Sequence, residues 1–154
     1  MNPFIRKGKA MKNKFGWGIL FVSTAFFAAC GSDSSSSSND IPVDEVSCFV
    51  QKNSNNVEKT EIMMGVKAVS TYTFDGDSLV ISTVVTFGSV WDEASISANC
   101  ERRKADTDAT VTCEADKMTE VTKEKTLLNN NLTQLESDQK AECEDFMDTY
   151  EDAE

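Results

Sequence analysis

The fold is decided by residues 66–87, VKAVSTYTFDGDSLVISTVVTF. Both arms of this stretch are rich in β-branched and aromatic residues, and Asp75-Gly76 between them tolerates the positive φ angles of a tight turn. The stretch therefore predicts a β-hairpin whose two-residue loop, Asp75-Gly76, is flanked by Phe74 and Asp77. Side-chain alternation places the large apolar residues of both arms on one face, which we expect to be the core: Val66, Ala68, Tyr72, Phe74, Leu79, Ile81, Val85 and Phe87.

Segments on either side of this hairpin extend the sheet. Upstream, residues 46–52 and 57–64 predict two strands joined by the turn-rich residues 53–56. Downstream, residues 109–114 and 118–123 predict a last pair of strands. The sheet is therefore expected to have about five or six strands.

Residues 90–104 fit two structures. Some of their apolar residues alternate as in a strand, but acids gather near the start and bases near the end, which complements a helix dipole. We therefore expect a helix here, with Ser89 as its capping residue.

The carboxyl-terminal segment predicts a longer amphipathic helix. Its inward-facing residues recur at spacings of three or four: Leu128, Leu132, Leu135, Gln139, Cys143, Phe146 and Tyr150. A small sheet needs a cover, so we expect this stripe to pack on it, although such a stripe can also dock a partner helix. The predicted fold is α+β: an antiparallel sheet covered by a long C-terminal helix, with a second, shorter helix.

The amino-terminal segment has the parts of a secretory signal. A basic region precedes the apolar residues 15–29 and is formed by Arg6, Lys7, Lys9, Lys12 and Lys14. Ala28 and Ala29 then stand directly before Cys30, in an arrangement that resembles the processing site of bacterial lipoproteins, although Phe27 occupies a place that is usually aliphatic. The resemblance implies that the Cys30 thiol receives a diacylglyceryl group and becomes the first residue of the mature chain.

This resemblance covers residues 12–38 and implies anchoring and export rather than an activity. Gly31 follows Cys30 where aspartate would favour the inner membrane, so the resemblance implies the outer membrane, at its periplasmic face or the cell surface. The alternative is an uncleaved transmembrane helix over residues 15–32. Translation can begin at Met1 or at Met11, since both starts leave a basic region.

The expected domain organisation has four parts. Residues 1–29 are the signal peptide, and residues 30–41 comprise the lipidated cysteine and a flexible linker rich in serine. Residues 42–150 form one α+β domain. Residues 151–154 form a frayed tail, because seven acids and no base follow position 141 and oppose the helix dipole.

Four cysteines remain after Cys30 is set aside: Cys48, Cys100, Cys113 and Cys143. In an exported domain this number predicts two disulfides, for which three pairings are possible. We expect Cys100 to pair with Cys143 and Cys48 to pair with Cys113. A zinc site is disfavoured because the chain contains no CxxC pair and no histidine, and a catalytic thiol would lack its usual base.

Charge and composition narrow the function. Beyond Ala29 the chain has 10 basic and 26 acidic residues, a net charge of −16, which disfavours nucleic acid and anionic lipid as partners. No motif assigns a catalytic residue, cofactor or metal. We expect a membrane-anchored envelope lipoprotein that acts as a non-enzymatic binding module for an envelope protein or polysaccharide. The alternatives are a carboxylate-dependent hydrolase of envelope or extracellular polymer and a structural spacer.

Overall fold

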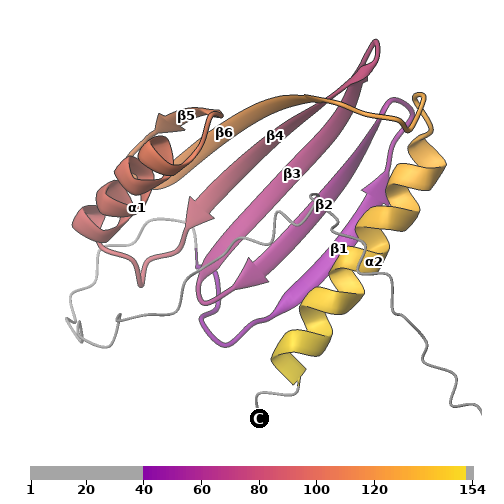
Figure 1. The fold of residues 1–154 in the computed structure, drawn as a ribbon. Coiled ribbons are helices and arrows are strands. Elements are labelled where there is room, and N and C mark those ends of the chain that lie inside the picture. Colours follow the sequence, from indigo (N-terminus) through magenta and orange to yellow (C-terminus); the bar gives the residue numbers. More distant parts are fainter. Residues whose placement is uncertain (1–39, 152–154) are drawn as a thin grey trace, which may run out of the picture. The chain divides into compact units, whose positions relative to one another are not determined.

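The computed structural model describes residues 40–151, which form an α+β domain with a six-stranded antiparallel sheet and two helices (Figure 1). The strand order is β1-β2-β3-β4-β6-β5, so β6 lies between β4 and the edge strand β5. The signal peptide, Cys30 and most of the predicted linker and tail lie outside the described residues. The elements in chain order are β1 (Ser47–Lys52), β2 (Asn56–Met63), β3 (Val66–Asp75), β4 (Ser78–Phe87), α1 (Glu93–Asp106), β5 (Thr110–Cys113), β6 (Lys117–Lys125) and α2 (Leu132–Glu151).

The predicted hairpin is present as β3 and β4, but its loop lies one residue further along. Asp75 pairs with Ser78, so the loop is Gly76-Asp77, and Gly76 takes the positive φ of 65° that the first loop position requires. The predicted pairing of Phe74 with Asp77 is therefore wrong, and Phe74 pairs with Leu79. The predicted core face is confirmed, because this shift moves the pairing by two residues and leaves every side chain on its predicted face.

A second tight turn joins β2 to β3. Met63 pairs with Val66, and both loop residues have positive φ, 52° at Met64 and 72° at Gly65, as a type I′ turn requires. A Cβ at Gly65 would approach the Val90 side chain to 2.7 Å. This loop therefore needs glycine both for its backbone angle and for its close contact with the β4–α1 connection.

Helix α1 is confirmed, but Ser89 does not cap it. Asp92 is the N-cap residue, and its Oδ1 accepts a hydrogen bond from the Ser95 N–H at 2.7 Å. The start is displaced because Trp91 is held first: its ring packs edge-on against Phe87, and its Nε1 donates to the Met64 carbonyl at 3.0 Å. Because these contacts fix Trp91, the helix begins only after it, with Asp92 as the N-cap residue.

Helix α2 contacts β1 and β2 at one end of the sheet. Asn131 begins it, since its Oδ1 accepts a hydrogen bond from the Gln134 N–H at 3.0 Å. The apolar stripe faces inward as predicted: Leu135 is buried with Val57, Tyr72 and Leu79. Leu128 was predicted to lie on this helix but precedes it, and it packs against the same core from the turn before α2. Burial of these side chains supplies the main attraction between the helix and the sheet.

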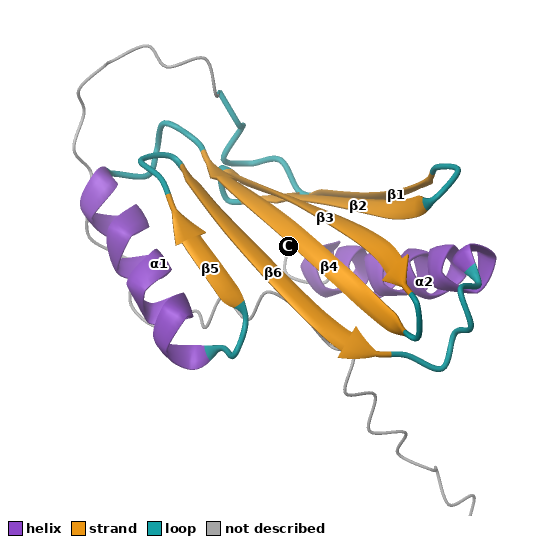
Figure 2. Ribbon diagram, turned by 90° about the horizontal axis from the view of Figure 1, so that it is seen from above, coloured by secondary structure: helices purple, strands orange, loops and turns teal. Residues whose placement is uncertain are grey.

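Both helices lie against the same face of the sheet, at its opposite ends. Figures 1 and 2 show α1 beside β5 and α2 along β1, the two edge strands. Along the register, Cys48 of β1 and Cys113 of β5 fall on one face, and each is bonded to a helix. In the part of the chain that the structure describes, neither helix is long and apolar enough to cross a membrane.

Candidate functional site

Two disulfides fasten the helices to the edge strands. Cys48 of β1 is bonded to Cys143 of α2, and Cys100 of α1 is bonded to Cys113 of β5. Two disulfides were predicted and are present, but the predicted pairing is wrong. Cys48 and Cys113 lie in one row across the sheet with four strands between them, a separation of roughly 24 Å, whereas disulfide Cα atoms lie within about 7 Å.

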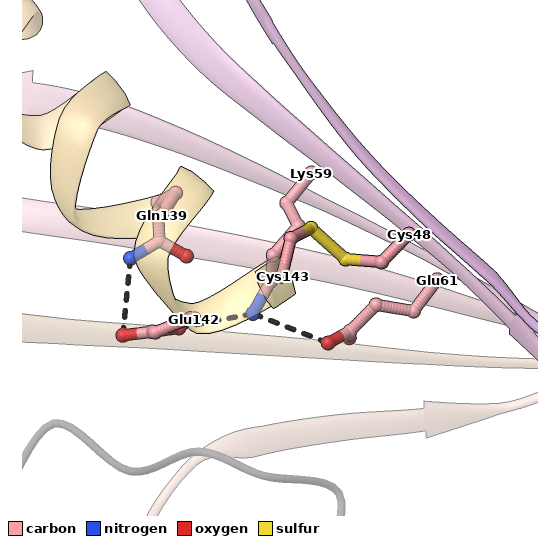
Figure 3. The surroundings of a disulfide bond; sticks show 6 residues. All are labelled: Cys48, Lys59, Glu61, Gln139, Glu142 and Cys143. Carbon is pink, nitrogen blue, oxygen red and sulfur yellow. Dashed lines mark hydrogen bonds and ion pairs between the residues drawn. A yellow bond between two sulfur atoms is a disulfide. The ribbon is translucent and has the colours of Figure 1, made fainter. Parts of the chain in front are cut away.

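A buried lysine joins β2 to α2 beside the first disulfide (Figure 3). The Lys59 side chain is only 3% exposed, and its Nζ lies 3.1 Å from Glu142 Oε2 and 3.3 Å from Glu61 Oε1. Its ammonium group also interacts electrostatically with the Tyr72 hydroxyl. Gln139 donates to Glu142, while its own buried Oε1 has no partner among the described residues. We call Lys59, Glu61, Tyr72, Gln139 and Glu142 the Lys59 cluster.

The cluster keeps Lys59 charged. Burial alone would lower the pKa of Lys59, but interactions with Tyr72, Glu61 and Glu142 outweigh it and raise the pKa to about 12. Burial raises the pKa of Tyr72. The Lys59 ammonium lowers this pKa and the Glu142 and Glu61 carboxylates raise it further, so that it too reaches about 12. At neutral pH the lysine is thus a cation and the tyrosine is neutral, so neither is a ready nucleophile or general base.

These two pKa values predict a loss of stability in strong alkali. Both are higher in the folded protein than the ordinary values of 10.5 and 10.0, so between about pH 10 and 12 the unfolded chain binds fewer protons than the folded one. Their stabilisation is complete below this window and disappears as the pH rises through it, with a loss on the order of 2 kcal/mol per group. Urea unfolding measured at several pH values should show this fall.

The control for this prediction is Tyr72→Phe, which keeps the ring and removes the titrating hydroxyl. The fall in stability between pH 10 and 12 should be shallower in this variant than in the parent protein. If the free energy of unfolding falls equally steeply with pH in the two proteins, the loss of stability between pH 10 and 12 does not come from the Lys59 cluster.

A line of polar side chains runs from the Lys59 cluster across the same face. Lys59, Ser70, Thr83 and Glu120 are consecutive neighbours on β2, β3, β4 and β6. Ser70 and Thr83 share a hydrogen bond of 2.9 Å, and Glu120 receives hydrogen bonds from Arg103 of α1 at 2.7 and 3.1 Å. Each end of this line therefore forms an ion pair with a helix: Lys59 with Glu142 of α2, and Glu120 with Arg103 of α1. The Ser70 hydroxyl is hydrogen-bonded to another hydroxyl and not to a general base.

Glu124 is the described carboxyl whose pKa is raised. Burial raises its pKa, and its Oε1 is buried without a partner among the described residues. Glu120 lies on the same face of the same strand but four residues away, about 13 Å, and is held by Arg103. Carboxyl pairs that hydrolyse glycosidic bonds stand about 5 to 9.5 Å apart, so these two do not form such a pair.

The opposite face of the sheet carries neither helix, and we call it the open face. It consists of the alternate strand residues that point away from Cys48 and Cys113, and valine, threonine, serine and lysine predominate among them. On the three adjacent strands β3, β4 and β6 these residues are Lys67, Val69, Thr71, Thr73, Asp75, Ser78, Val80, Ser82, Val84, Thr86, Lys117, Thr119, Val121, Lys123 and Lys125.

The site residues predicted from the sequence are the four domain cysteines and Cys30. All four domain cysteines form disulfides that attach helices, and Cys30 lies outside the described residues. Sequence reasoning missed the Lys59 cluster. A signal for it was available, because Lys59 alternates in phase with the apolar Val57 and Met63 and so belongs on their face.

Comparisons with protein-family models, with curated proteins and with solved structures give no match for this chain.

Proposed function

We propose that this protein is a lipid-anchored lipoprotein of the bacterial envelope that acts as a non-enzymatic binding module. The lysine-rich start, the apolar run and Ala28-Ala29-Cys30 support export and acylation. Two disulfides in a small domain support residence in an oxidising compartment outside the cytosol. Two acyl chains on Cys30 would hold the protein to a membrane, with residues 31–41 as the linker.

The observation that carries the binding role is the one-sided arrangement of the helices. Both are fastened to the same face, so the open face offers a rigid surface of side chains to a ligand. In this proposal α2 covers the β1–β2 end of the sheet, and its apolar stripe serves as core rather than as a docking surface, since Leu135 and Cys143 are buried.

Two other functions are less well supported. A hydrolase acting through carboxylates would need an acid and a base close together, whereas Glu120 is engaged by Arg103 and lies far from Glu124 along β6. A structural spacer needs no sheet face left uncovered by helices, whereas here one face is left open and carries Lys67, Lys117, Lys123 and Lys125. A binding module accounts for this open face.

Replacement of Cys30 tests the anchoring. Cys30→Ser is expected to lack the acyl mass and the cleavage after Ala29 that the parent undergoes. Any form of it that is cleaved should leave the detergent-soluble membrane fraction for the aqueous fraction, because stable attachment depends on two acyl chains. Intact-mass analysis with thiol alkylation would report acylation and disulfides together. Cys48→Ser is the matched control, since it removes a cysteine but should keep the lipid.

Two results would contradict the proposal. One is a Cys30→Ser variant that matures and partitions into membranes like the parent protein. The other is a parent protein whose four domain thiols all alkylate without prior reduction.

A further inference from the structure

The open face differs in charge from the rest of the domain. Residues 40–151 contain 10 basic and 23 acidic residues, a net charge of −13. Four of the ten bases, but only two of the 23 acids, lie on the strand residues of the open face: Lys67, Lys117, Lys123 and Lys125, with Glu58 and Asp75. The strand residues of this face therefore carry a net charge of +2 on a strongly negative protein, while Glu114, in the turn after β5, stands opposite Lys117.

Most of these lysines are available to a ligand. Lys123 forms an ion pair with Asp75, with 2.5 Å between Nζ and Oδ2, and both side chains are exposed. Lys67, Lys117 and Lys125 have no carboxylate partner among residues 40–151, and Lys67 and Lys125 are exposed. Within the described part of the chain, three cationic groups on one face thus lack a carboxylate counter-ion.

The lysines stand apart, at two ends of the face. Lys67 and Lys117 flank Thr86 in one row, with their backbones roughly 10 Å apart. Lys123 and Lys125 lie about 20 to 27 Å further along β6. The belt between the two ends is uncharged on β3, β4 and β6 and presents hydroxyl and aliphatic groups, with Thr71 directly opposite Ser82 and Val69 opposite Val84.

We infer that the open face binds an acidic polysaccharide with widely spaced anionic groups, which gives the proposed binding module its ligand class. The separated lysines match such a polymer, whose carboxylates alternate with neutral sugars. Threonine and serine hydroxyls both donate and accept hydrogen bonds, as sugar hydroxyls do, and β-branched side chains hold them rigidly. The aliphatic groups beside them suit the apolar faces of sugar rings.

Other occupants fit this surface less well. Nucleic acid carries about one charge per 1.7 Å of duplex, which is far denser than these lysines. Bound single strands need several aromatic platforms, whereas Phe49 is the one aromatic residue among the described strand residues of this face. A second copy would bring two positive faces together. An extended acidic peptide would bind the backbone of an edge strand rather than a face.

The test is binding of the full-chain protein, purified in neutral detergent from whichever cell fraction holds it, to immobilised hyaluronan, which has a carboxylate on every second sugar. Dextran serves as the neutral polymer, polyglutamate as the acidic peptide and duplex DNA as the dense polyanion. We expect hyaluronan to bind, with an affinity that falls as salt rises, and dextran to bind weakly or not at all.

Lys67→Gln/Lys117→Gln should weaken hyaluronan binding about tenfold, the effect of losing two exposed ion pairs. Lys104→Gln/Lys140→Gln is the matched control, because it removes the same charge from α1 and α2. Equal weakening by both pairs, stronger binding of polyglutamate or DNA, or no binding of hyaluronan would overturn the inference. These results are independent of Cys30 acylation, so failure here leaves the anchoring proposal standing, and failure of anchoring leaves this test valid.

Discussion

Replacing Cys48 and Cys143 together by alanine is expected to lower the free energy of unfolding by about 4 to 5 kcal/mol, against about 3 kcal/mol for Cys100→Ala/Cys113→Ala. The difference arises because the first bond closes a sequence separation of 95 residues and the second a separation of only 13. The longer loop removes more conformational freedom from the unfolded chain. A loss of this size is a large part of the 5 to 15 kcal/mol that typically stabilises a domain.

Urea unfolding followed by circular dichroism would measure both variants under identical conditions. Each variant removes a whole cysteine pair, so neither leaves a free thiol, and each serves as the control for the other. The two losses should differ by about 2 kcal/mol. Equal losses, or a larger loss for the α1–β5 bond, would contradict the assignment of the main covalent constraint to the bond between β1 and α2.

The hairpin shows what the sequence alone could predict. Alternation along residues 66–87 assigned every large apolar side chain to its observed face, even though the loop was placed one residue early. The face assignment survived because side-chain direction has a period of two, and the pairing moved by two residues. Local patterns likewise located β1, β2, β5, β6 and both helices.

The disulfide pairing could not be predicted in the same way, because it depends on strand order. Strand β6 enters the sheet between β4 and β5, which sends Cys113 to the edge opposite Cys48. No local pattern in residues 109–125 encodes this placement. The short separation between Cys100 and Cys113, in consecutive elements, was the available signal for the observed bond.

The Lys59 cluster was missed for a related reason. A lysine in a short strand normally faces solvent, and the partner that buries this one, Glu142, lies 83 residues later in the chain. Alternation with Val57 indicates the correct face, but only the arrival of α2 makes that position a buried one. Tertiary contact, rather than local preference, decides the environment of Lys59.

Lys59→Met is therefore expected to destabilise the domain by about 3 to 5 kcal/mol, although methionine matches the lysine stem in size. The substitution leaves the Glu61 side chain, only 12% exposed, facing Glu142 with no cation between them. A buried charge without a partner costs much more than the intact pair contributes. Lys104→Met is the control, since its ammonium lies on the surface of α1 beside Glu101, and it should change stability by less than about 0.5 kcal/mol.

A combined variant separates charge from packing. In Lys59→Met/Glu61→Gln/Glu142→Gln the cation and both carboxylates are neutral, so most of the stability lost in Lys59→Met should return. The same variant should also fall less steeply between pH 10 and 12, because the Lys59 titration is gone. If the combined variant is instead no more stable than Lys59→Met, the loss comes from packing of the lysine stem rather than from the unpaired carboxylates. Urea unfolding at neutral pH, with circular dichroism as the signal, distinguishes these results.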